Sequence, residues 1–196
     1  SRFGCTIVAH PQVDLWYRGI TGFIQHLLDC YMAQLVALAT RRRIKRVGYR
    51  RKVNPDYPVM DRENLPIFPD WSVLHVPGHT THDIALYNME SGILYCADCI
   101  IHVRGRLNLP IPVFFTELMK ESIAKLAGLG AKLIIPAHGD PILVEERPDV
   151  FGRMTEITDV PHNRVQKRFH RLSNFAPDVW RWKLREVVKK RFKRVV

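Results

Sequence analysis

The sequence predicts an α/β domain in which short strands alternate with helices. Short apolar runs typical of strands recur between Ser72 and Ile135, and turn residues such as Pro77-Gly78 separate them. Two longer segments instead repeat their apolar residues every three or four positions, as one face of a helix does. The chain has 196 residues, of which 46% are hydrophobic and 25% charged, which is typical of a folded globular domain. Alternation of these elements favours a layered α/β architecture.

The expected elements follow one another along the chain. Asn54 to Asp70 carries four prolines and is expected to be a loop. Ile20 to Ala39 is interrupted by polar residues too often for a membrane-spanning helix, so we expect a buried or interfacial helix. The predicted strands are Cys5–Val8, Ser72–Val76, Ile84–Tyr87, Ile93–Cys96 and Leu133–Ile135, and the predicted helices are Phe23–Ala39 and Thr116–Leu129.

Positive charge is concentrated in two segments, and the whole chain has a formal net charge of +11. Arg41 to Lys52 holds eight basic residues in twelve, and Arg181 to Arg194 holds eight more among aromatic residues. We expect a main domain over residues 1–148 and a basic, aromatic-rich helical tail over 149–196. The first segment is a solvated helix end and loop, and the second is a solvated helix docked on the domain by its aromatic side, unless they contact nucleic acid or an anionic membrane surface. The charge also favours a small anionic substrate.

The cellular compartment is inferred from the cysteines and from the N-terminal residues. Four unevenly spaced cysteines do not make a disulfide framework, which favours a reducing compartment. Ser1 to His10 does not resemble a signal peptide. We therefore expect a cytoplasmic protein.

Three polar residues directly follow predicted strands and are the candidate metal ligands: His79, Asp98 and His138. Imidazole nitrogens and carboxylate oxygens suit zinc, iron and manganese, and a carboxylate can bridge two ions. Gly78 and Gly139 adjoin the two histidines and allow tight turns that direct both rings to a common point.

The neighbours of these residues have less specific roles. Thr80, His82 and Asp83 follow His79 closely and could support a metal or a substrate, although for His82 we favour an exposed turn residue. Cys96 and Cys99 have the C-x-x-C spacing of a zinc or redox pair. We expect them instead to be small buried residues.

Three stretches of the sequence resemble the third, fourth and fifth motifs of the metallo-β-lactamase fold hydrolases, a family that includes glyoxalase II, lactonases and some nucleases. These stretches are Leu74–Tyr87, Ser91–Asp98 and Leu133–Gly139, and Cys5–Pro11 resembles the strand after the second motif. The resemblance implies an αββα sandwich, incomplete at its N-terminus. It implies two zinc ions, with iron or manganese as alternatives, of which His79 holds one, His138 holds the other and Asp98 bridges both.

The sequence departs from the family pattern at two points. The second motif, H-x-H-x-D-H, which carries the remaining ligands, does not occur in the chain. Either the chain is a C-terminal portion of an enzyme or it is a degenerate, non-catalytic member. Ala97 replaces the glycine that the family usually has before the aspartate, and we expect the added methyl group to be tolerated.

The resemblance implies a metal-dependent hydrolase, active if the missing motif is supplied. A metal-activated hydroxide, positioned by Asp98 as the catalytic residue, would attack an ester, thioester or lactone. A nuclease is the alternative enzyme, but only one loop and one helix are expected between Asp98 and His138, which leaves no room for a large inserted domain. A non-catalytic protein that binds RNA or an anionic membrane through its basic segments is the alternative from another class.

Overall fold

The computed structural model describes residues 4–39, 48–160, 167 and 175–181 of the chain. The chain divides into two compact units. The sheet unit comprises Ser1–Pro11 and Pro55–Arg168, and the helix unit comprises Gln12–Asn54 and Phe169–Val196. The sheet unit contains both strands and helices, which confirms the predicted α/β class.

The sheet unit is built on a five-stranded sheet with the order β3-β4-β5-β8-β9. Its strands are β3 (Trp71–His75), β4 (Ile84–Asn88), β5 (Ile93–Tyr95), β8 (Leu133–Ile135) and β9 (Ile142–Leu143). The predicted strands over this region are confirmed to within one residue at each end. Neighbouring strands are antiparallel except β5 and β8, which are parallel. The carboxyl ends of β5 and β8 therefore meet at one edge of the sheet.

The connection from β5 to β8 contains more structure than the sequence predicted. It includes a short 3-10 helix (Ala97–Cys99), a hairpin of β6 (Ile101–Val103) and β7 (Arg106–Asn108), and helix α2 (Thr116–Ala127). The predicted single loop before the helix was wrong. Strands of three residues are too short for an alternating pattern to be distinguished from a loop.

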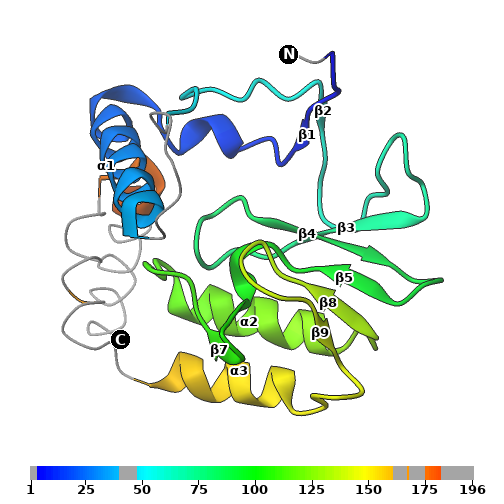
Figure 1. Cartoon of the computed structure of the whole chain (residues 1–196). Coiled ribbons are helices and arrows are strands. Elements are labelled where there is room, and N and C mark those ends of the chain that lie inside the picture. The colour runs from blue at the N-terminus through cyan, green and yellow to red at the C-terminus, as the bar shows by residue number, and fades with distance from the viewer. Residues whose placement is uncertain (1–3, 40–47, 161–166, 168–174, 182–196) are drawn as a thin grey trace, which may run out of the picture. The chain divides into compact units, whose positions relative to one another are not determined.

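Helices α2 and α3 (Val150–Asp159) pack together beneath the sheet in Figure 1. Met119, Ile123 and Leu126 of α2 are fully buried in one core cluster with Leu94 of β5 and Ile134 of β8. Their spacing of three and four residues gives α2 one apolar face, as the sequence predicted. Because this face is buried in the same core as β5 and β8, it fixes the position of α2 relative to the two strands that α2 connects.

The first strand of the sheet unit differs from its prediction. Strand β1 covers only Val8–Ala9, not Cys5–Val8, and it pairs in parallel with β2 (Tyr57–Pro58). The carbonyl of Ile7 accepts hydrogen bonds from both Asp56 and Tyr57. The partner strand lies inside the expected proline-rich loop, so the local sequence gave no indication of where pairing begins.

In the helix unit, α1 (Gly19–Ala39) follows a short 3-10 helix (Val13–Leu15) and confirms the predicted helix, which begins four residues earlier than expected. The two faces of α1 are the reverse of those of an ordinary amphipathic helix, because apolar side chains are exposed and a polar side chain is buried. Ile20, Leu27 and Tyr31 are 82%, 51% and 61% exposed, whereas Gln25 is only 1% exposed. Among the described residues, no helix is long and apolar enough to cross a membrane.

Most of the two basic segments lies outside the described residues. Residues 40–47 and 182–196 are among those whose structure is not described. Helix α3 lies in the region predicted as a helical tail, and it packs within the sheet unit. The domain boundary at 148/149 stays a prediction.

Candidate metal centre

His79 lies in the loop that follows β3. This loop packs directly against α2. A Cβ on Gly78 would lie 2.8 Å from the Cα and Cβ of Met119, so only glycine permits this close approach of loop and helix. The Gly78 carbonyl accepts a hydrogen bond of 3.0 Å from the backbone N–H of Phe115. Gly78 therefore helps to position His79 because it lets the loop pack closely against the helix. The backbone φ of Gly78 is not in the left-handed region, so the glycine is not required here for a tight turn.

The half-buried His79 ring is held in one orientation by a backbone carbonyl. Its Nδ1 lies 2.7 Å from the Pro112 carbonyl oxygen. Because a carbonyl only accepts, Nδ1 must carry the proton and donate. In the neutral ring Nε2 then keeps its lone pair, which is the arrangement of a metal-ligating histidine oriented by a carbonyl.

Thr80, His82 and Asp83 form a hydrogen-bonded turn behind His79. The Asp83 carboxylate accepts hydrogen bonds from the Thr80 backbone N–H at 2.7 Å and from the Thr80 hydroxyl at 2.6 Å. The Thr80 hydroxyl oxygen in turn accepts from the His82 N–H at 3.3 Å. These contacts support a positioning role for Thr80 and Asp83, since they fix the backbone that carries His79.

Asp98 follows β5 and sits in the short 3-10 helix. Its side chain is 29% exposed, and its Oδ1 atom is buried without a hydrogen-bond partner among the described residues. A buried carboxylate oxygen without a donor is costly unless a cation or proton neutralises it. The preceding Ala97 has a φ of 49°, in the left-handed region, so its methyl group is tolerated at the cost of backbone strain.

His138 follows β8 and lies beside Asp98. The distance from His138 Nε2 to Asp98 Oδ1 is 3.6 Å, and the His138 side chain is 68% exposed. The next residue, Gly139, has a φ of 104° and lies against the backbone of His102 in β6, where any side chain would collide with the His102 carbonyl. Here the expectation of a glycine-dependent turn agrees with the geometry.

The β6–β7 hairpin contributes a histidine that sequence analysis did not single out. The His102 backbone N–H donates to the His138 carbonyl at 3.2 Å, and His102 Nδ1 contacts the Asp140 carbonyl at 2.9 Å. Its Nε2 is buried without a hydrogen-bond partner among the described residues. Because the hairpin was not predicted, no pattern in the sequence linked His102 to His138.

The structure brings together two of the three predicted ligands. Asp98 and His138 are adjacent, whereas His79 does not complete a cluster with them. Within the part of the chain that the structure describes, no group of three or more His, Cys, Asp or Glu side chains is arranged to hold a metal ion. The donors that are present nevertheless suit a metal, because Asp98 offers a buried oxygen that accepts no hydrogen bond among the described residues and His79 offers a lone pair at Nε2.

Cys96 and Cys99 flank Asp98 but are buried and reduced. Their exposed fractions are 0% and 2%, and neither forms a disulfide. Burial raises the pKa of the Cys96 thiol to about 12 and that of Cys99 well above its ordinary value. Protonated thiols are poor metal ligands and nucleophiles. The expectation that they are small buried residues is confirmed.

A histidine stack lies behind the His79 loop. The rings of His10 and His75 are parallel within 12°, with centroids 4.5 Å apart. His75 Nε2 also lies 2.8 Å from the Thr81 carbonyl oxygen. Burial and the nearby His75 and His82 lower the pKa of His10 to about 4. Sequence analysis missed this stack because the two residues are far apart in the chain.

Comparisons with known proteins identify the family of this fold. The model of the metallo-beta-lactamase superfamily matches residues 10–138, more than half of the chain. The chain is 31% identical over 93 residues to the probable metallo-hydrolase YflN of Bacillus subtilis (strain 168), a match that covers 40% of this chain and 35% of the relative.

Two solved structures share the fold. An archaeal metallo-beta-lactamase superfamily protein from Sulfolobus tokodaii has a TM-score of 0.55 and 15% identity, with 85% of this chain and 66% of that protein covered. The B3 metallo-beta-lactamase BLEG-1 has a TM-score of 0.51 and 19% identity, with 79% and 67% covered. The chain thus spans about a third of the curated relative and about two thirds of each structure.

Proposed function

Because the chain belongs to the metallo-beta-lactamase superfamily, we propose that it forms the part of a metal-dependent hydrolase that contributes His79, Asp98 and His138 to the metal centre. The name of its relative, a probable metallo-hydrolase, supports hydrolysis as the reaction class. The proposed substrates are esters, thioesters or lactones. Catalysis requires, in addition, the ligands that an H-x-H-x-D-H motif supplies.

The buried Asp98 oxygen is the observation that carries this proposal. Asp98 and His138 follow β5 and β8, the parallel pair in the sheet, and this topology directs both side chains to one edge. Asp98 Oδ1 is buried without a hydrogen-bond partner among the described residues and lies 3.6 Å from His138 Nε2, so the two side chains offer adjacent donors to a cation.

The residues present fit one part of a two-metal site. His79, Asp98 and His138 would be the residues that hold the metal, with zinc proposed and iron or manganese as alternatives. Bound metal ions would supply a nucleophilic hydroxide near neutral pH and would polarise the scissile bond. Asp98 is proposed to orient the attacking water and to accept its proton. Asp83 and Thr80 hold the His79 loop in position throughout.

Metal binding tests the assignment without requiring activity. We would titrate Zn²⁺, Mn²⁺ and Fe²⁺ into the chain by calorimetry and compare Asp98→Asn and His138→Gln with Asp140→Asn. Asp140 is an exposed neighbour of His138 outside the proposed ligand set, so it is a matched control. We expect weak binding that both ligand variants reduce by about tenfold or more, as loss of one charged contact implies. Equal binding by all variants would exclude the site.

Substrate class is tested with the chain extended by a segment that carries the H-x-H-x-D-H motif. A nitrophenyl ester, a thioester, a lactone and a phosphodiester would be compared at matched metal content. Hydrolysis of the first three but not the phosphodiester is expected. Preference for the phosphodiester would instead indicate a nuclease.

A second candidate function, attachment to an anionic membrane surface, is favoured by the inverted helix α1. Its buried face is polar: Gln25 Nε2 donates to Asp29 at 2.8 Å, and the Tyr17 hydroxyl donates to the same carboxylate at 3.0 Å. Its exposed face is apolar. At the border of this face, the Arg51 guanidinium lies over the Phe23 ring, 5.2 Å from the ring centre. Apolar stripes bordered by cations are typical of helices that lie in a lipid interface.

Vesicle sedimentation distinguishes this candidate from a solvated helix. Binding to vesicles with phosphatidylserine, but not to phosphatidylcholine alone, is expected, together with loss of binding in the double variant Leu27→Gln, Tyr31→Gln. Both side chains are exposed, so the variant should fold normally. Retained binding in the double variant would show that the apolar stripe is not the membrane contact. If the wild type instead forms a dimer that the double variant does not form, the stripe would be the contact with a second copy of the chain.

A further inference from the structure

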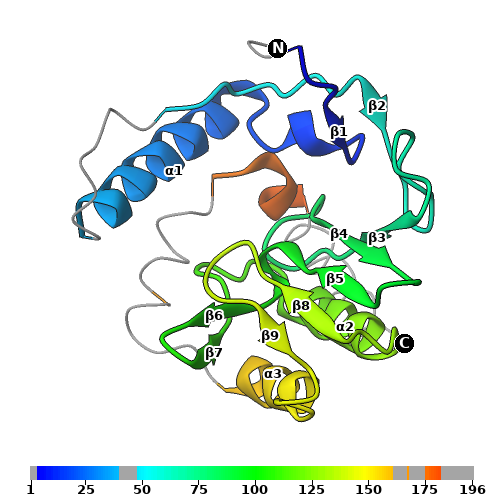
Figure 2. The same ribbon diagram turned by 45° about the vertical axis from the view of Figure 1, so that its right-hand side comes forward.

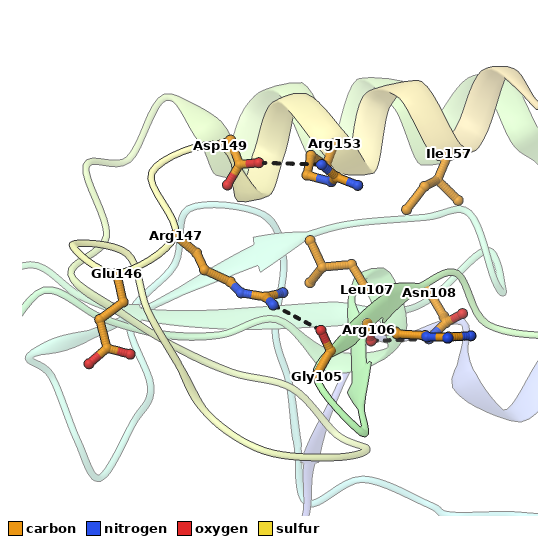
Figure 3. Close-up of a pocket in the computed structure, with 9 residues that line it drawn as sticks. All are labelled: Gly105, Arg106, Leu107, Asn108, Glu146, Arg147, Asp149, Arg153 and Ile157. Carbon is orange, nitrogen blue, oxygen red and sulfur yellow. Dashed lines mark hydrogen bonds and ion pairs between the residues drawn. The ribbon is translucent and has the colours of Figure 1, made fainter.

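The sheet unit contains a polar cavity of about 600 Å³ that the proposed hydrolase site does not use. The hairpin β6–β7 forms one wall, and α3 with the segment that precedes it forms the other, as Figure 3 shows. The cavity faces Arg106 and Leu107 from the hairpin and Arg147, Arg153 and Ile157 from the second wall. In Figure 2 the hairpin and α3 again lie side by side.

The two walls are joined by a specific hydrogen bond. Arg104 and Gly105 form the hairpin turn, with φ angles of 53° and 72°, which is the conformation of a tight two-residue turn. The Arg147 guanidinium donates to the Gly105 carbonyl at 2.8 Å. This contact holds the turn against the segment before α3, so the cavity exists without a ligand.

The lining is suited to an anion. It includes three arginines, whose planar guanidinium groups bind phosphate through paired hydrogen bonds. Of the two acids, Glu146 points away from the other side chains in Figure 3. Asp149 lies 3.8 Å from Arg153, and both side chains are more than half exposed, so this ion pair is weak.

Two further features specify the ligand more closely. Asp149 precedes α3 without capping it through its side chain, so the positive end of the helix adds to the field at the cavity. Leu107 and Ile157 project from opposite walls in Figure 3 and are half-buried against the hydrophobic core. They offer an apolar surface next to the cations.

We propose that this cavity binds a small organic phosphate monoester, with the phosphate on the arginines of the lining and the organic group on Leu107 and Ile157. Arg147 is already engaged by Gly105 and serves mainly to hold the walls together. The proposal does not depend on the metal centre, because none of these residues is a proposed metal ligand.

Calorimetry on the metal-free 196-residue chain tests the proposal with three probes: phenyl phosphate, inorganic phosphate and phenol. We expect phenyl phosphate to bind more tightly than inorganic phosphate and phenol not to bind. Arg106→Gln and Arg153→Gln should each weaken phenyl phosphate binding about tenfold, the usual effect of losing one charged hydrogen bond. Asp149→Asn should tighten it about threefold, because a competing carboxylate is removed. A misfolded variant would not bind more tightly.

Arg104→Gln is the matched control, since Arg104 lies in the same hairpin turn but does not line the cavity. It lowers the net charge by the same amount as Arg106→Gln and should leave binding unchanged. Amide NMR shifts on addition of phenyl phosphate should centre on Gly105 and Leu107. Equal weakening by Arg104→Gln and Arg106→Gln would show general attraction to a basic protein and would overturn the proposal, as would shifts centred elsewhere.

Discussion

Acidification should destabilise the sheet unit through His10, because this ring is folded away in its neutral form. His10 is 4% exposed and stacked on His75, and its pKa is lowered to about 4 by burial and by the neighbouring His75 and His82. In the unfolded chain the same ring titrates near 6.5. Between these values the unfolded state binds a proton that the folded state does not.

The size of the effect follows from the two pKa values. The contribution of His10 to stability is complete above pH 6.5 and is lost as the pH falls towards 4. From about pH 7.5 to about pH 4.5 the loss amounts to about 2.5 kcal/mol, by proton linkage. The variant His10→Phe keeps an aromatic ring on His75 but cannot bind a proton, so it should lack this part of the pH dependence.

Urea unfolding of the wild type and His10→Phe at a series of pH values measures the difference. The stability gap between the two proteins should change by about 2.5 kcal/mol in favour of the variant on acidification. A second variant, His75→Phe, removes one neighbouring charge but leaves His10 buried, so its pH dependence should fall in between. Parallel curves for all three proteins would refute the reasoning, as would an NMR titration that placed the His10 pKa near 6.5.

Four further changes have definite expected outcomes. Gly139→Ala should lower the unfolding free energy by more than about 2 kcal/mol, since φ is 104° and the new methyl group would collide with the His102 carbonyl; unchanged stability in urea would contradict this. Ala97→Gly should raise it by about 1 kcal/mol, because φ is 49°; a lower urea midpoint would argue against strain there. Tyr87→Phe should cost about 1 kcal/mol through loss of the 2.8 Å hydrogen bond to the Leu129 carbonyl, which thermal unfolding would show. Cys96 and Cys99 should react with a thiol reagent only after unfolding, in contrast to the exposed Cys5 and the partly exposed Cys30; rapid reaction of Cys96 or Cys99 in the native state, located by peptide mass mapping, would be inconsistent with their burial.

Local pattern predicted most of the regular structure. Helix α2 and strands β3, β4, β5 and β8 were predicted correctly because each carries its own periodic or continuous apolar signal over several residues. Asp98 and His138 were singled out as candidate site residues because each directly follows such a strand. The superfamily was also evident from the stretches around these residues.

The features that the sequence did not predict depend on pairing between distant segments. Strand β1 is defined by its partner at Tyr57–Pro58, and the β6–β7 hairpin is placed by contacts between His102 and the loop after β8. The outward apolar face of α1 was also hidden. Periodicity shows that a helix has two faces but does not show which face its own unit covers.

The sequence by itself determined the family, the type of most elements and the chemical identity of the candidate ligands. Only the tertiary structure decided that Asp98 and His138 lie 3.6 Å apart, that His10 is held neutral beneath His75, and that three arginines line one cavity. The physical reason is the distance along the chain over which each kind of interaction acts. Helical and strand propensities act over a few neighbouring residues, whereas the bond from Arg147 to Gly105 joins residues 42 positions apart and forms only when the whole sheet unit has folded.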